Sequence, residues 1–244
     1  MPAATTRTNR PATTRQRRKE ARPHELLEAA LDLFAEKGFA GTRSEEVAQR
    51  AGVSKGTLYL YYPSKEELFK AVIAHSLSAR IADTAQQVEA YRGPMGPLLQ
   101  DLLVQWWQQA YAGHASCTFK IIVSEVRNFP DIADFYLHNV IEPGAALIGG
   151  IVRRGVALGE FRAGTDIENT VHSLVLPMVM LCVHKHGLGA CTAHRIDGHR
   201  FIAEHVALVV RGLTAAPTQG THLESPAASA PPSARKSPPR QRPR

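Results

Sequence analysis

The sequence predicts an all-α fold, and three observations support that class. Apolar residues recur at the three- and four-residue spacing of amphipathic helices from about residue 23 to residue 213. No segment alternates strictly between apolar and polar side chains, as a half-buried strand would. Residues that start or stop helices, such as Ser54, Ser64 and Gly38, stand at the ends of the periodic segments. We therefore expect helices joined by short turns.

Composition and cysteine usage limit the class of protein. The chain has 244 residues, 44% hydrophobic and 21% charged, which is typical of a soluble globular protein of one or two domains. Its three cysteines, Cys117, Cys182 and Cys191, form no CxxC pair, so a reducing cytoplasm is expected. The most apolar run, at 174–183, is roughly half as long as a membrane span requires. It is interpreted as a buried helix, and no membrane attachment is expected.

The basic charge of the chain is concentrated in two tails. The formal net charge is +7, of which residues 1–22 contribute +6 and residues 217–244 contribute +4, so the body carries −3. Residues 1–22 and 215–244 contain too few large apolar side chains to offset chain entropy, and both are predicted to be disordered. Any DNA-binding surface on the body must therefore depend on the local placement of charge.

Two helices are predicted at the start of the body. The first covers about 23–37, because Pro23 suits the first turn of a helix, where its missing N–H costs nothing. The second covers about 43–51, with Thr42 as the N-cap and Glu45 three residues later. That pair is expected to form a capping box.

A short third helix, at 55–61 and ended by Pro63, completes a helix-turn-helix motif over about 43–62. Gly52 supplies a left-handed turn, Ser54 caps the helix, and Leu58 holds it against the preceding one. Four side chains are then left on or near its exposed face: Lys55, Thr57, Tyr59 and Tyr61. The free N–H groups at its start are also expected to point outward, as phosphate binding requires.

The remaining chain is predicted to be helical as well. Ser64 and Glu67 form a further capping box, which starts a long fourth helix, and Gly93 with Pro94 marks the passage to later helices. The expected ranges are 64–90, 98–112, 116–128, 132–158, 166–186 and 196–213.

Residues 33–69, LFAEKGFAGTRSEEVAQRAGVSKGTLYLYYPSKEELF, resemble the DNA-binding domain of the tetracycline-repressor (TetR) family. The GVSKGTLY segment followed by SKEEL is specific to that family, and the resemblance is strong over about 23–80. It implies a three-helix DNA-binding domain at 23–80 and a helical ligand-sensing and dimerisation domain at 81–214. The residues implied to contact operator DNA are Thr42, Arg43, Ser54, Lys55, Gly56, Thr57, Tyr59, Tyr61 and Lys65.

Two positions depart from the family's pattern. Leu60 is apolar where members often carry a polar or aromatic residue, so it either contacts a thymine methyl group or packs within the protein. Tyr62 stands where phenylalanine is commoner. The basic segment 7–22 either follows DNA beyond the motif or is only a solubilising tail.

The last two helices carry broad apolar faces. In the family, the equivalent pair packs against its copy as a four-helix bundle, and a dimer also reads two half-sites. The alternative is that these faces are buried within one chain. The predicted interface residues are Val171, Leu174, Val175, Met178, Leu181, Ile202, Val206, Val209 and Leu213.

An effector pocket is expected among the middle helices. Aromatic side chains with a few polar tips suit a small apolar or aromatic molecule, although for any one of these residues a place in the ordinary core is the favoured alternative. The candidate lining residues are Trp106, Trp107, Tyr111, Phe119, Phe135, Met178 and His184. The spacing of the nearby cysteines and histidines fits no established zinc pattern, so no metal and no cofactor are predicted.

These observations favour a ligand-responsive repressor that binds a palindromic operator as a homodimer. A transcriptional activator is one alternative, and a ligand-binding or scaffolding protein that has lost DNA binding is another. An enzyme is not expected, because the sequence contains no nucleophile motif, phosphate loop or paired-carboxylate arrangement.

Overall fold

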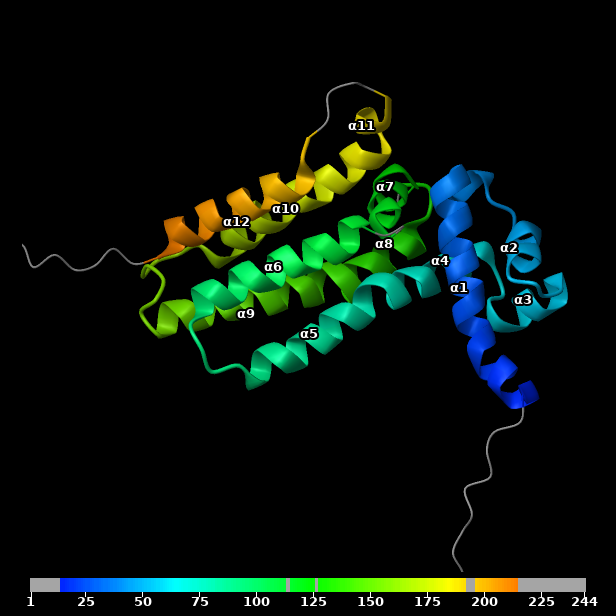
Figure 1. Cartoon of the computed structure of the whole chain (residues 1–244), viewed down its shortest axis with the longest axis horizontal. Helices are drawn as coiled ribbons and strands as arrows, with labels where there is room; N and C mark the ends of the chain where they lie inside the picture. The colour runs from blue at the N-terminus through cyan, green and yellow to red at the C-terminus, as the bar shows by residue number, and fades with distance from the viewer. Residues whose placement is uncertain (1–13, 113–114, 126, 192–195, 215–244) are drawn as a thin grey trace, which may run out of the picture.

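The protein is an elongated bundle of helices (Figure 1). The computed structural model describes residues 14–112, 115–125, 127–191 and 196–214. Within these ranges, extended backbone pairs only at one isolated antiparallel bridge, between Phe161 and Thr214. The predicted all-α class is confirmed. The two segments predicted to be disordered tails, 1–22 and 215–244, lie outside the described residues apart from 14–22.

The N-terminal unit is made of four helices around an apolar core. Leu26, Phe34, Val47, Leu58 and Phe69 are all almost fully buried in that core. The helices are α1 (Thr14–Gly41), α2 (Ser44–Arg50), α3 (Lys55–Tyr61) and α4 (Lys65–Ile73). The bounds of α3 are those predicted from its capping serine and the proline that follows it.

Helix α1 corrects one prediction and confirms another. It begins at Thr14 rather than near Pro23, so Pro23 lies inside the helix and 14–22 are helical rather than a disordered arm. The fixed φ of proline is itself helical, so the backbone can continue on its N-terminal side at the cost of one hydrogen bond. Gly38 has φ 75° and ψ 173°, which breaks the helix at the predicted position before a last turn to Gly41.

A continuous helical segment joins the two halves of the molecule. Ser64 Oγ accepts the N–H of Glu67 at 3.1 Å, as predicted, and α4 then continues through the π-helical turn η1 (Ala74–Ser78) into α5 (Ala79–Ala90). The predicted domain boundary at residues 80 and 81 therefore lies inside a helix. A movement of α5 would be transmitted directly to α4 and to the N-terminal unit.

The C-terminal unit consists of longer helices that run side by side (Figure 1). Asp166 and Asp197 cap two of them by accepting the N–H groups of Asn169 and Arg200, each at 3.0 Å. The short helix α11 was not predicted. The elements are α6 (Met95–Ala112), α7 (Ala115–Glu125), α8 (Pro130–Tyr136), the π-helical turn η2 (Leu137–Ile141), α9 (Glu142–Ala157), α10 (Ile167–His186), α11 (Leu188–Cys191) and α12 (Gly198–Leu213).

Helix α10 is central to this unit, because it packs against α7, α9 and α12, while α12 also packs against α6. The segment 130–157 and α10 are long and apolar enough to cross a membrane by length and composition, a test that core helices also pass. The face of α10 that includes Leu174, Met178 and Cys182 is fully buried within the chain. This burial agrees with the prediction of a core helix.

An aromatic cluster joins the two units. Phe39 of the N-terminal unit lies with its ring 5.6 Å from that of Phe34 and 5.3 Å from that of Phe69. The Phe129 ring, from the turn before α8, packs edge-on against Phe39 at 4.9 Å. The core of the N-terminal unit is thus continuous with a residue of the C-terminal unit, so the two units are packed together at this point.

Candidate nucleic-acid interface

Helix α3 is fixed in place by a turn, a cap and one buried side chain. Gly52 adopts φ 66°, a left-handed conformation that only glycine adopts readily. Ser54 Oγ accepts the backbone N–H of Thr57 at 3.1 Å and so caps the helix. Leu58 is fully buried against the core. All three features match their predicted roles, and together they determine which face of α3 points outward.

The outward face of α3 contains most of the predicted DNA-contacting residues. Lys55, Gly56 and Tyr59 are exposed, and Thr57 and Tyr61 are half-buried at its edges. A helix turns by about 100° per residue, so side chains one or two positions from Leu58 cannot share its inward direction. Helix α3, seven residues long, therefore presents polar and aromatic groups and the exposed Leu60 to solvent, with the dimensions that a major groove admits.

Lys55 is held in an exposed ion pair with Glu45 of α2. This contact raises the pKa of the lysine and lowers the pKa of the Glu45 carboxyl, with the side-chain hydrogen bond as the largest cause of both shifts. The ammonium also lies 5.7 Å from the centre of the Tyr59 ring. Lys55 is thus charged and accessible, but a phosphate would compete with Glu45 for it.

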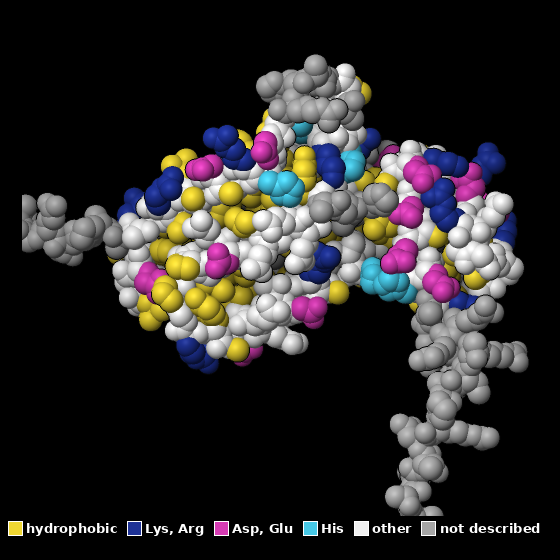
Figure 2. All heavy atoms as spheres, in the orientation of Figure 1, with side chains coloured by type: hydrophobic (Ala, Val, Ile, Leu, Met, Phe, Trp, Pro, Cys, Tyr) yellow, Lys and Arg dark blue, Asp and Glu magenta, His cyan; other side chains and the backbone are white. Residues whose placement is uncertain are grey.

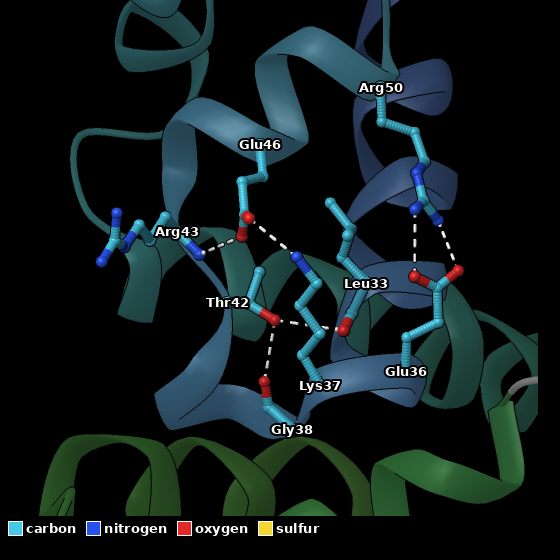
Figure 3. Close-up of polar contacts among 8 residues, drawn as sticks. All are labelled: Leu33, Glu36, Lys37, Gly38, Thr42, Arg43, Glu46 and Arg50. Carbon is cyan, nitrogen blue, oxygen red and sulfur yellow. Dashed lines mark hydrogen bonds and ion pairs between the residues drawn. The ribbon is translucent and has the colours of Figure 1, made fainter.

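Thr42 does not have its predicted place on the surface. Only 2% of it is exposed, and its hydroxyl donates to the carbonyls of Leu33 at 3.1 Å and Gly38 at 2.8 Å (Figure 3). It closes the end of α1 and is not the N-cap of α2. Arg43 takes the N-cap position, and its N–H is accepted by Glu46 rather than by a side chain at position 45. The predicted capping box is therefore shifted by one residue.

Lys65 also serves the fold rather than an exposed phosphate site. Its ammonium donates to the carbonyls of Phe39 at 2.9 Å and Thr42 at 3.2 Å, and it lies 4.5 Å from the centre of the Phe39 ring. The last carbonyls of a helix lack partners within it, and a cation satisfies them. The sequence placed Lys65 correctly at the start of α4, but it could not show that the end of α1 lies beside it.

Two ion pairs attach α2 to α1 on the surface of this unit (Figure 3). Both terminal nitrogens of Arg50 donate hydrogen bonds to the Glu36 carboxylate, at 2.6 and 3.0 Å, and the Lys37 ammonium donates to Glu46 at 2.7 Å. Surface pairs of this kind stabilise a fold only modestly, but the two-point contact of Arg50 restricts the orientation of α2. Charges of both signs are interspersed on the face of this unit that Figure 2 shows.

The predicted dimer residues lie on the wrong side of their helices. Leu174, Met178, Ile202 and Val206 are fully buried within one chain, and Val171, Leu181 and Leu213 are nearly so. The alternative of burial within one chain is therefore the correct one for these residues. Val175 and Val209 are half-buried.

The opposite faces of α10 and α12 are apolar and exposed, and the sequence analysis missed them. Their large side chains are Leu176, Met180, Phe201 and Leu208, with exposed fractions of 60%, 64%, 45% and 63%. Leu176 and Met180 are one helical turn apart on α10, and Phe201 and Leu208 are two turns apart on α12. His205 of α12 contacts the Ser173 carbonyl of α10 at 2.8 Å, which holds the two helices together.

The predicted effector-pocket residues lie among α6, α7, α8 and α10. Trp107, Phe119 and Met178 are buried, whereas Trp106, Tyr111, Phe135 and His184 are half-buried. Trp107 stacks on Tyr111 with ring centres 4.5 Å apart. Trp107 Nε1 and His184 Nε2 are buried without a hydrogen-bond partner within the described residues. These residues lie in the same part of the molecule. A hollow of about 470 Å³ lies elsewhere and includes none of them; it is lined by Arg162–Asp166, Asn169, Thr170, Ser173, Val209, Gly212 and Leu213.

The N-terminal unit matches a family model. Residues 26–72 match the model described as "Bacterial regulatory proteins, tetR family". This range runs from Leu26, within α1, to Val72, one residue before the end of α4, and it includes the whole of α2 and α3.

Similarity to curated proteins is strong at the N-terminus and weaker over the whole chain. The transcriptional regulator RutR of Escherichia coli K12 is 43% identical over 84 residues, which are 34% of this chain and 38% of RutR. The chain thus aligns with well under half of RutR. The transcriptional repressor KstR2 of Mycolicibacterium smegmatis is 24% identical over 195 residues, covering 80% of this chain and 91% of KstR2. These relatives are regulators, in agreement with the prediction that the chain is not an enzyme.

The fold as a whole is shared with solved structures. FadR of Bacillus subtilis, solved in complex with stearoyl-CoA, superposes with a TM-score of 0.64 over 78% of this chain and 98% of FadR. Only 17% of the aligned residues are identical, so this likeness concerns the fold. It extends over both units, which the family model alone does not.

Proposed function

The chain belongs to the tetR family of bacterial regulatory proteins. From that premise we propose that it is a cytoplasmic repressor that binds palindromic operator DNA as a homodimer. We further propose that it responds to a small apolar or aromatic effector. One observation supports this most strongly. Leu58 anchors α3 to the core while Lys55 and Tyr59 remain exposed on its outer face, as insertion into a major groove requires.

The homodimer is proposed to form through the exposed apolar faces of α10 and α12. Leu176, Met180, Phe201 and Leu208 are large apolar side chains exposed on these two helices, and exposed apolar side chains that lie close together mark protein interfaces. Several hydrophobic patches lie over the C-terminal unit on the face that Figure 2 shows. A two-fold interface uses the same patch on both copies. It would place the two α3 helices to read half-sites about one helical turn of DNA apart, roughly 34–36 Å.

The effector is proposed to act through the junction between the two units. Phe129 packs on Phe39, and the segment 65–90 runs through both units without a break. An effector among α6, α7 and α10 that favours one packing of these helices would change the position of α4 and hence of α3. It can change DNA affinity only by the ratio of its affinities for the two packings. The acyl-CoA held by FadR, a fold neighbour, supports an apolar ligand.

The test is a selection of genomic fragments by the purified full chain, followed by titration of the enriched fragment. We expect a palindromic site that is bound by a dimer, with an affinity that falls steeply as the salt concentration rises. A Tyr59→Ala variant should lose that enrichment while unfolding at the same temperature. If the wild-type chain enriches no fragment, the proposal is wrong, and a binding protein without a DNA target is the better description.

A further inference from the structure

Leu60 is the most exposed large apolar side chain among the described residues, with 80% of its surface accessible. It lies in the second turn of α3, next to Tyr59. The sequence left two roles open for it, packing within the protein or contact with a base. An exposed fraction of 80% rules out packing within the chain. A leucine in this position does not stabilise the fold of the chain, so its side chain is free to contact whatever α3 binds.

Leu60 shares its side of the helix with Gly56, which precedes it by one turn. Measured around the helix axis at about 100° per residue, Gly56 and Leu60 both lie about 160° from the buried Leu58. They therefore form the outermost line of α3, which we call the outer ridge. Lys55 and Tyr59 lie to one side of this ridge, and Thr57 lies to the other.

The fold of the chain itself does not require glycine at position 56. Its φ is not positive, and a Cβ added there would meet only Ser54 Oγ, at 3.9 Å. Glycine is also a poorer helix former than alanine. The absence of a side chain therefore benefits a close approach from outside the molecule, at the same ridge on which Leu60 projects.

We propose that the outer ridge reads a thymine in each half-site: Gly56 allows the edge of a base pair to approach the backbone, and Leu60 packs on the C5-methyl group of that thymine. Thymine is the one base that presents a methyl group in the major groove. The edges of the other bases present only hydrogen-bond donors or acceptors at the polar positions there. The Leu60 side chain would exclude water from these groups without forming a hydrogen bond to them, which is unfavourable. This inference rests on the proposed DNA binding and adds a specific base contact to it.

The experiment removes the methyl group alone. In the selected operator, each thymine is replaced in turn by deoxyuridine, and binding is measured for the wild-type chain and for Leu60→Ala. Burial of one methyl group corresponds to about a fourfold change in affinity. We expect the wild-type chain to lose about fourfold at one thymine per half-site. Leu60→Ala should bind the thymine operator correspondingly more weakly and should not distinguish thymine from deoxyuridine at that position.

The control is Leu158→Ala, which removes another leucine that is 60% exposed, at the end of α9 and far along the chain from α3. It should retain the wild-type discrimination. A second variant, Gly56→Ala, should weaken operator binding by about tenfold or more, while its thermal unfolding midpoint stays the same or rises.

Three outcomes would overturn the inference, and they are distinguishable. If no thymine is sensitive to loss of its methyl group, or if Leu60→Ala keeps the same sensitivity, the methyl contact is wrong although DNA binding stands. If Gly56→Ala binds like the wild type, the close approach is wrong. If the wild-type chain binds no DNA, the inference falls together with the proposed function.

Discussion

The short helix α3 and the long helices α10 and α12 were predicted from the same kind of signal, and the outcomes differ. In α3, the residues expected to face outward do so, because a single leucine, Leu58, anchors the inward side. In α10 and α12, the residues expected at a dimer interface are in the core of one chain, and a second apolar stripe faces outward. A helix with one apolar stripe has only one possible orientation, whereas a helix with two has two orientations that periodicity alone cannot distinguish.

The largest effect is expected from charges on the outward stripe. Leu176→Glu combined with Met180→Glu should convert a dimer into a monomer, because burying carboxylates in an apolar interface is strongly unfavourable. Operator affinity should fall by more than about 100-fold, since one α3 reads too few bases. Light scattering with size-exclusion chromatography and DNA titration measure the two effects. Leu158→Glu is the control. If the double variant stays dimeric, α10 is not part of the dimer interface.

The next effect separates the two stripes of α10 by stability. Leu174→Ala should lower the free energy of unfolding by about 2–5 kcal/mol, because it leaves a cavity in the core of one chain. Leu176→Ala, two residues away, should change the free energy of unfolding of a dissociated chain by less than about 0.5 kcal/mol. Denaturant titration of each single variant, at protein concentrations low enough for the dimer to dissociate, isolates this difference. Equal losses for the two substitutions would contradict the assignment of the faces.

On the N-terminal unit, Lys55→Ala should weaken operator binding by about tenfold and reduce the slope of log affinity against log salt by about one. The reason is that Lys55, on contact with a phosphate, would displace one of the counterions that are condensed on the DNA. Lys120→Ala, at an exposed lysine of α7, should change neither quantity. The measurement is fluorescence anisotropy over a salt series, and an unchanged slope for Lys55→Ala would assign the lysine to its ion pair alone.

A smaller and opposite effect is expected at the partner of Lys55. Glu45→Gln removes the carboxylate that competes with phosphate, so affinity for any duplex should rise by about two- to threefold at low salt. Selectivity between operator and unrelated DNA should fall accordingly. Weaker binding by Glu45→Gln would instead mean that the pair positions Lys55 for its contact.

The smallest effect is expected at Cys182, whose rate of thiol labelling should not change when the dimer dissociates. Burial raises the pKa of this thiol to about 12, and that of Cys117 to about 11, so both are almost entirely protonated at pH 8. A thiol-reactive reagent should label Cys182 about tenfold faster for each unit that the pH rises toward that pKa, because the thiolate is the reacting form. The labelling rate should be the same in the dimer and in the monomeric double variant. Faster labelling in the monomer would mean that the partner, rather than its own chain, covers the inner face of α10. Cys191 is exposed and should react first in both forms.

The site residues show where sequence reasoning succeeded and why it stopped. Ser54, Gly52 and Leu58 act through residues close to them in the chain, and all three have their predicted roles. Thr42 and Lys65 also contact backbone, but their partners are carbonyls at the end of α1, up to 26 positions away. A local pattern does not reveal which helix end lies beside a side chain.

The sequence by itself determined the helices, most of their caps and the outward direction of α3, because these depend on interactions within one or two helical turns. Only the tertiary structure decided that Thr42 and Lys65 close the end of α1, and which stripe of α10 and α12 faces out. Those choices depend on packing between helices that are distant in the chain. Apolar periodicity specifies how much of a helix must be covered, but it does not specify what covers it.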